Sequence, residues 1–287
     1  MPARQMSLSP EVDDPRRTLD DLVARALAYR SGPELKALFE FSRKFPQFAP
    51  YDAVLLDVQS GGIQYALSAR RWEAMYQRRV KPGGRPYVVL RTMGPVDFVF
   101  DLSDTEPIDP EHDLVPPVAR DPFAAKGDLD PDELTKLERA CLRIGIEVEK
   151  KDLATGGAGR VERLSRHGFD FHLLLNVKHT PVQQLGSLAH ELGHVFCGHL
   201  GMTKLGFWPD RVHLDKKVVE FEAESVAYLI ALRRSLDIGS DRYLSDYLDP
   251  SVELPPISLE AILKASGKIE EMLGGRFRVP RIRRATT

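Results

Sequence analysis

The sequence contains little cysteine, with only Cys141 and Cys197 among its 287 residues. So few thiols exclude a small fold held together by disulfide bonds, as in many secreted proteins. The chain also lacks an apolar run long enough to cross a membrane, and residues 1–15 lack the apolar stretch of a signal peptide. These absences lead us to expect a cytoplasmic protein that makes no contact with a membrane.

The net charge is also slight, at −2, so the chain is not basic throughout. Its hydrophobic content of 43% and its charged content of 29% are ordinary for a soluble globular protein. The length allows one large domain or two small ones with a substantial core, and no internal repeat is evident. The function therefore has to be inferred from local motifs rather than from composition.

The clearest motif is His190-Glu191-x-x-His194. Two histidines four residues apart lie on one face of an α-helix, where both rings can bind one Zn²⁺. A glutamate beside the first histidine then lies near the open coordination position, where it can take a proton from water. The alternative is a pair of histidines on a helix surface. We interpret His190 and His194 as zinc ligands and Glu191 as the general base.

The residues around this motif favour a helix that begins at Thr180. Thr180, Pro181 and Gln183 predict an N-cap, a proline at the first helical position and a capping box. Apolar residues then recur at helical spacing, at Leu185, Leu188, Ala189, Leu192, Val195 and Phe196. The preceding stretch Phe169–Val177 predicts a largely buried strand, which we expect to offer its edge to an extended peptide.

A third zinc ligand is expected in the apolar helix Val218–Leu232, which carries Glu220, Glu222 and Glu224. Buried carboxylates require a cation or strong hydrogen-bond donors, and a catalytic zinc usually has three protein ligands. Glu220 and Glu224 are four residues apart, so one can bind zinc while the other orients a ligand histidine. Glu222 points elsewhere and is interpreted as a solvated or salt-bridged surface residue. Cys197 lies a turn too far along its helix and is interpreted as a core residue.

These two motifs together resemble the ImmA/IrrE-type and related gluzincin metallopeptidases. Members of these families carry HExxH and then Glu-x-x-Ala followed by Asn, Asp or Glu on a later helix. The resemblance covers roughly residues 140–250 and implies a zincin-like fold. It also implies that Glu220 is the third zinc ligand and Glu224 the acid that supports a ligand histidine.

Tyr243 and Tyr247 lie at helical spacing further along the chain. Similar zincins place a tyrosine or histidine in this region as a hydrogen-bond donor to the oxyanion. The resemblance therefore implies a catalytic role for Tyr247. Packing explains both tyrosines equally well.

The chain as a whole predicts an α+β protein of two domains. Residues 1–16 are polar and expected to be disordered, and residues 17–104 predict several helices and a β-hairpin. Residues 105–131 are rich in proline and aspartate and are interpreted as a linker. Residues 132–274 form the expected peptidase domain, and residues 275–287 a basic tail.

Positive charge gathers between Ala69 and Arg91, a stretch called the basic segment below. It holds six arginines and one lysine against a single glutamate, with aromatic residues interleaved. Basic groups beside aromatic rings are a common arrangement for holding single-stranded nucleic acid. The candidate contacts are Arg70, Arg71, Trp72, Arg78, Arg79, Lys81 and Arg85. In the alternative interpretation, Trp72 is a core residue and the arginines form a solvated surface.

Residues 35–105 resemble the N-terminal domain of ArdC-type antirestriction proteins. The resemblance rests on Tyr51–Gln59, Trp72, Arg79–Gly83 and Phe98–Thr105. It implies a module that binds single-stranded DNA and precedes a zincin domain. The turn Lys81-Pro82-Gly83-Gly84 departs from the Lys-Gly-Glu-Lys-Gly-like turn usual in the family.

An acidic run follows, with eleven acidic and two basic residues between Asp101 and Glu133. Such runs are usually solvated, although this one can also shield the basic segment. We therefore expect a zinc-dependent metalloendopeptidase with a domain that binds single-stranded DNA, acting on a protein in antirestriction, mobile-element or stress biology. One alternative is an antirestriction protein whose zinc is structural. Another is a protease that acts on proteins bound or crosslinked to DNA.

Overall fold

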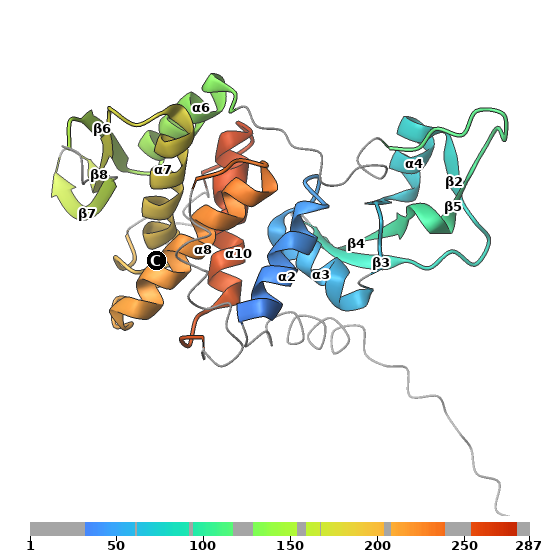
Figure 1. The fold of residues 1–287 in the computed structure, drawn as a ribbon, viewed down its shortest axis with the longest axis horizontal. Coiled ribbons are helices and arrows are strands. Elements are labelled where there is room, and N and C mark those ends of the chain that lie inside the picture. The colour runs from blue at the N-terminus through green and yellow to red at the C-terminus, as the bar shows by residue number, and fades with distance from the viewer. Residues whose placement is uncertain are drawn as a thin grey trace, which may run out of the picture.

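The computed structural model describes residues 32–60, 62–91, 94–116, 129–153, 159–166, 168–203, 208–238 and 254–279. The expected disordered start, most of the expected linker, the last eight residues of the basic tail and Tyr247 lie outside these ranges. The described chain is a mixture of helices and strands, as the sequence predicts. The sheet at one end and the strands at the other are separated by a central group of helices (Figure 1).

The first half of the chain combines short helices with short strands. In order these are α2 (Gly32–Arg43), α3 (Pro50–Gln59), β1 (Ala66–Leu67), α4 (Ala69–Tyr76), β2 (Arg78–Val80), β3 (Tyr87–Arg91), β4 (Gly94–Asp101), the 3₁₀ turn η1 (Leu102–Asp104) and β5 (Thr105–Pro107). The expected hairpin is the β3–β4 pair, and β1 adds to its other side in the order β1-β4-β3. A separate pair joins β2 to β5.

The second half contains a three-stranded sheet and the longer helices. Its elements are α6 (Pro131–Arg143), β6 (Ile146–Lys151), β7 (Gly159–Arg166), β8 (Phe169–Asn176), α7 (Pro181–Phe196), α8 (Lys216–Arg233) and α10 (Leu259–Leu273). The sheet order is β6-β8-β7, with β6 parallel and β7 antiparallel to β8. The expectation that Phe169–Val177 offers an edge is therefore wrong, because β8 is paired on both sides. Among the described strands the free edge beside α7 belongs to β7.

The main core does not separate at the expected domain boundary. Leu38 and Phe39 of α2 and Leu55 of α3 are buried in the same cluster as the apolar side chains of α7, α8 and α10. The ring of Phe39 lies 6.2 Å from that of Tyr228 in α8. A smaller cluster beneath the β1-β4-β3 sheet uses the other face of α2 and α3. The two N-terminal helices thus serve both cores, and the interval expected as a linker starts with a paired strand, β5.

Arg233 at the end of α8 fastens these helices together. Its guanidinium donates to the carbonyl oxygens of Ser42 and Phe48 at 2.6 and 2.7 Å and pairs with Glu270 of α10 at 2.6 Å. The carbonyls at the end of a helix have no partner within it, so a buried arginine satisfies them well. None of the helices in the described ranges has the length and hydropathy needed to span a membrane.

Candidate metal centre

Helix α7 begins where the sequence predicts and presents both motif histidines to α8. The Thr180 side chain accepts from the Gln183 backbone N–H, and the Gln183 side chain accepts from the Thr180 backbone N–H, so the capping box is complete. The buried stripe of α7 faces the core, and the helix packs along α8.

The glycine inside the motif lets the two helices approach closely. A Cβ atom at Gly193 would lie 3.0 Å from the Cα atom and 3.2 Å from the carbonyl oxygen of Ala223. These are backbone atoms, which cannot move aside as a flexible side chain can. The small residues Gly193 and Ala223 therefore set the distance at which the carboxylates of α8 meet the histidines of α7.

His190, His194 and Glu220 converge as the sequence predicts. The two Nε2 atoms lie 3.1 Å apart, and the Glu220 Oε2 atom lies 3.6 Å from that of His190 and 3.9 Å from that of His194. Two atoms that bind one Zn²⁺ at tetrahedral geometry with bonds of about 2.0–2.1 Å are roughly 3.3 Å apart. The three donor atoms therefore fit a zinc ion.

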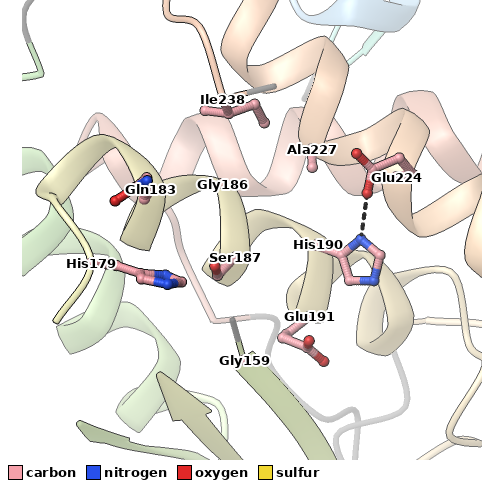
Figure 2. Close-up of a pocket in the computed structure, with 10 residues that line it drawn as sticks. All are labelled: Gly159, His179, Gln183, Gly186, Ser187, His190, Glu191, Glu224, Ala227 and Ile238. Atoms are coloured by element: carbon pink, nitrogen blue, oxygen red, sulfur yellow. Dashed lines mark hydrogen bonds and ion pairs between the residues drawn. The ribbon is translucent and has the colours of Figure 1, made fainter. Parts of the chain in front are cut away.

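Glu224 supports the first ligand. Its Oε2 atom lies 2.9 Å from Nδ1 of His190 (Figure 2), which turns Nε2 of that ring toward the cluster. The carboxylate accepts the Nδ1 proton, so Nε2 keeps its lone pair for a metal. Burial alone would lower the pKa of His190, but the hydrogen bond to Glu224 and the nearby carboxylate charges outweigh it and raise the pKa.

The second histidine lies deeper. Burial, together with the rings of His190 and His199, lowers the pKa of His194 to about 3. A neutral imidazole is the form that binds a metal. The ring of His194 is thus kept in its ligating form across the ordinary pH range.

Glu191 lies beside the cluster but points to a different side. Burial raises the pKa of its carboxyl group, and the charge of His190 and the backbone N–H of Val161 oppose the rise. A raised pKa suits a group that must both take and return a proton near neutral pH. Glu191 is not one of the three converging ligands, which agrees with its expected role as a base.

A cavity of about 440 Å³ opens beside these groups. Figure 2 shows His190 and Glu191 at one end and His179 and Gln183 at the other, near the start of α7. Small residues line the space between them, namely Gly159, Gly186, Ser187 and Ala227. The cavity is therefore wide enough for a chain to pass directly over Glu191.

Glu222 is not the surface residue that the sequence suggested. Its side chain is fully buried, and Arg211 donates to both of its oxygens at 2.7 Å. The polarity of the neighbouring residues gave no sign of this, because Arg211 lies in the segment before α8 and was not a candidate partner. Cys197 is buried, as expected.

Two of the expected nucleic-acid contacts are corrected. Trp72 is 0% exposed, its Nε1–H donates to the Phe100 carbonyl oxygen at 2.8 Å, and its ring packs edge-on against Tyr65. Arg78 is buried, bonded to Thr105 and ion-paired with Asp113. Both serve the fold, because the aromatic ring fills a core and the guanidinium ties β2 to β5.

The other basic candidates are exposed. Arg79 pairs with Glu106 at 2.8 Å, Lys81 donates to the Ser103 carbonyl oxygen, and Arg85 lies over the Tyr87 ring. Arg70 and Arg71 lie on the outer face of α4. Acidic residues that follow the sheet thus neutralise part of the basic segment, as the shielding interpretation predicts.

Comparison with known families adds to this geometry. A family model described as Peptidase M78, the IrrE N-terminal-like domain, matches residues 141–235, about a third of the chain. The match runs from the end of α6 to just beyond α8 and so contains the whole cluster. Neither a curated protein nor a solved structure matches this chain. The resemblance to ImmA/IrrE-type peptidases is confirmed, and the part of the chain that holds the cluster is a metallopeptidase-like domain.

Proposed function

We propose that this protein is a zinc-dependent metallopeptidase that hydrolyses an amide bond of a protein substrate. One observation carries the proposal: three donor atoms converge at an open cavity while a fourth group, Glu191, stands beside them without belonging to them. His190, His194 and Glu220 would hold the ion. Zinc bound there supplies Lewis acidity, which polarises a carbonyl group and makes water a better nucleophile.

In this proposal the chain itself moves the proton. Glu191 accepts a proton from the attacking water and then donates it to the amine nitrogen that leaves. Its raised pKa favours the second step, because the carboxyl group must exist transiently in its protonated form. Glu224 keeps the ring of His190 in place throughout.

The free edge of β7 suits an extended peptide. Gly159 begins this strand, lines the cavity, and brings its Cα so near Glu191 that an added Cβ would lie 3.4 Å from the Glu191 Cγ atom. An extended substrate that adds to such an edge by backbone hydrogen bonds would run past the general base. We therefore place the scissile bond between β7 and α7.

The rival proposal, a structural zinc, fits the site less well. Structural zinc sites are closed by four protein ligands, whereas only three converge here among the described residues. The side chain of Glu220 is 37% exposed, so the cluster is open on that side. A structural site also has no use for a general base at the position of Glu191.

The test combines metal content with cleavage. The purified chain is expected to hold about one Zn²⁺ by elemental analysis and to cleave members of a peptide mixture read by mass spectrometry. Glu191→Gln should keep the zinc and abolish cleavage, whereas His194→Ala should lose most of the zinc. An active Glu191→Gln variant, or a His194→Ala variant with full zinc content, would contradict the assignment.

We further propose that single-stranded DNA binds the exposed cations of the basic segment. Arg70, Arg71, Arg79, Lys81 and Arg85 support this, since all are exposed and lie on neighbouring elements. In a salt titration of labelled oligothymidylate, log K is expected to fall with a slope of roughly −0.7 per phosphate neutralised. A substrate bound or crosslinked to DNA would be favoured if the oligonucleotide also stimulated cleavage. An antirestriction, mobile-element or stress role follows from the family resemblances alone.

A further inference from the structure

A second group of polar side chains lies directly behind the metal centre. Cys197, His199 and Glu222 offer donor atoms within 4.8 Å of one another, and all three are buried. They come from the end of α7, the turn after it and the middle of α8. None of them lines the cavity that holds Glu191.

This group does not have the free donor atoms that a metal needs. Both oxygens of Glu222 accept from Arg211, and one of them also accepts from the Ser258 backbone N–H at 2.7 Å. Burial raises the pKa of the Cys197 thiol far above its usual range, and a metal would require the thiolate. The guanidinium of Arg211 would also repel a cation at this point. The group must therefore have another role.

The hydrogen bonds of His199 point to that role. Its Nε2 atom lies 2.9 Å from Oε2 of Glu222, and its Nδ1 atom lies 3.1 Å from Nδ1 of His194. Glu222 accepts only, so Nε2 of His199 carries the proton and Nδ1 of His199 is left as an acceptor. Nδ1 of His194 must then donate. The lone pair of His194 is thereby fixed on Nε2, the atom that faces His190 and Glu220.

We propose that His199, held by Glu222 and Arg211, is a positioning residue that sets the tautomer and ring orientation of the metal ligand His194. The chain of contacts is continuous: Arg211 to Glu222, Glu222 to His199, and His199 to His194. This inference rests on the proposed zinc site. It extends it by a residue that neither the HExxH motif nor the glutamates of α8 would indicate.

The two ligand histidines are thus supported in different ways. A carboxylate, Glu224, holds Nδ1 of His190 directly, whereas a second imidazole stands between the carboxylate and Nδ1 of His194. An imidazole acceptor fixes direction as well as a carboxylate does, but it adds less negative charge to the ligand. Groups in this outer layer typically change metal affinity by about 10–100-fold when they are removed.

The experiment measures zinc affinity by competition with a chromophoric chelator, together with the visible spectrum of the Co²⁺-substituted protein. His199→Phe removes both hydrogen bonds but leaves Glu222 paired with Arg211, so the fold should persist. We expect it to weaken zinc binding by about 10–100-fold and to change the Co²⁺ absorption bands. His199→Gln can still accept from His194 and donate to Glu222, and it should restore much of the affinity.

His172→Gln is the matched control. His172 is also buried and also bonded to a glutamate, Glu149, at 2.9 Å, but it lies on β8 away from the cluster. The control should leave zinc affinity and the Co²⁺ spectrum unchanged even where it lowers thermal stability.

The proposal is overturned if His199→Phe, or His199→Gln where the former does not fold, binds Zn²⁺ as tightly as the parent with an unchanged Co²⁺ spectrum, or if Phe and Gln are equally damaging. None of these readings depends on cleavage. A parent protein that binds zinc through His194 but cleaves nothing would refute the peptidase proposal and leave this one standing.

Discussion

The metal centre and the basic segment use their polar pairings to opposite ends. In the metal centre each histidine commits Nδ1 to a partner, which leaves Nε2 free and aimed at a common point. In the basic segment Arg78 and Arg79 commit their guanidinium groups to Asp113 and Glu106. The pairing therefore prepares a ligand in one region and removes binding capacity in the other.

The difference shows that residue type alone does not decide whether a cluster is functional. An imidazole has two nitrogen atoms, so one can be restrained while the other stays available. A guanidinium that is buried against a carboxylate has little left to offer a phosphate. The following expectations test this contrast, from the largest effect to the smallest.

Replacing Glu222 by alanine should cost the most stability. The change leaves the charge of Arg211 buried without its carboxylate, and breaking a buried pair from one side typically costs about 3–5 kcal/mol. Glu220→Ala in the metal-free protein should cost far less, because that side chain is partly exposed. Urea denaturation of both variants with zinc removed measures the difference. Equal losses would mean that the pairing of Glu222 is not what holds α8.

Trp72→Ala should unfold the β1-β4-β3 region rather than weaken DNA binding selectively. The ring packs on Tyr65 and Leu67 in a core of its own, and removal of a buried aromatic ring usually costs about 3–5 kcal/mol. Tryptophan fluorescence is ambiguous here, so near-ultraviolet circular dichroism and denaturant titration are the suitable measurements. A stable variant with reduced oligonucleotide affinity would return Trp72 to the nucleic-acid surface.

Gly193→Ala should disturb the metal centre without touching a ligand. The added methyl group meets the Ala223 backbone, and overpacking of this kind typically costs about 1–3 kcal/mol. Because it separates α7 from α8, we expect zinc affinity to fall together with stability. Gly267→Ala provides a control on α10, where a Cβ atom has an ordinary contact at 3.6 Å. Unchanged zinc affinity in Gly193→Ala would show that helix spacing does not limit the site.

Asp52 gives a carboxylate whose ionisation costs stability instead of adding it. Burial raises its pKa to about 6 from 3.8, against the hydrogen bond from the Leu90 backbone N–H. The folded protein then holds this proton more tightly than the unfolded chain, so stability falls as pH rises from about 4 to about 6. Asp52→Asn should raise stability at pH 7 by about 1–3 kcal/mol and have no effect near pH 3. A pH-independent difference in denaturation midpoint would contradict this explanation.

Replacing Arg70 and Arg71 by alanine should change stability least of all. Both side chains are exposed on α4, and such surface changes stay within about 0.5 kcal/mol. Oligonucleotide affinity should nevertheless fall, and its salt dependence should become shallower, because fewer phosphates are neutralised. Lys216 and Lys217, exposed at the start of α8, are the matched pair whose replacement should leave the slope unchanged.

The parts of this molecule that follow a local rule could be predicted from the sequence. The capping box at Thr180, the facing of His190 and His194, and the second motif of α8 depend on spacing within a helix. The β3–β4 hairpin likewise follows from alternation around a turn.

The parts that depend on distant segments could not be predicted. The burial of Glu222 requires Arg211, and the burial of Trp72 requires β4, which contributes the carbonyl oxygen of Phe100. Strand order is also a long-range property, so Phe169–Asn176 was recognisable as a strand but not as the middle one. His199 gave no signal of its own, because its neighbours on either side are unremarkable.

The shared core of α2, α3, α8 and α10 has a practical consequence for anyone who wishes to cut the protein. A fragment that begins at residue 129 would keep every metal ligand but would expose the surfaces on which Phe39 and Leu55 now lie, and Arg233 would lose the carbonyls of Ser42 and Phe48. Such a fragment should aggregate. Expression boundaries for the catalytic half belong before residue 32, and the helices that lead the chain are part of the enzyme rather than an attachment to it.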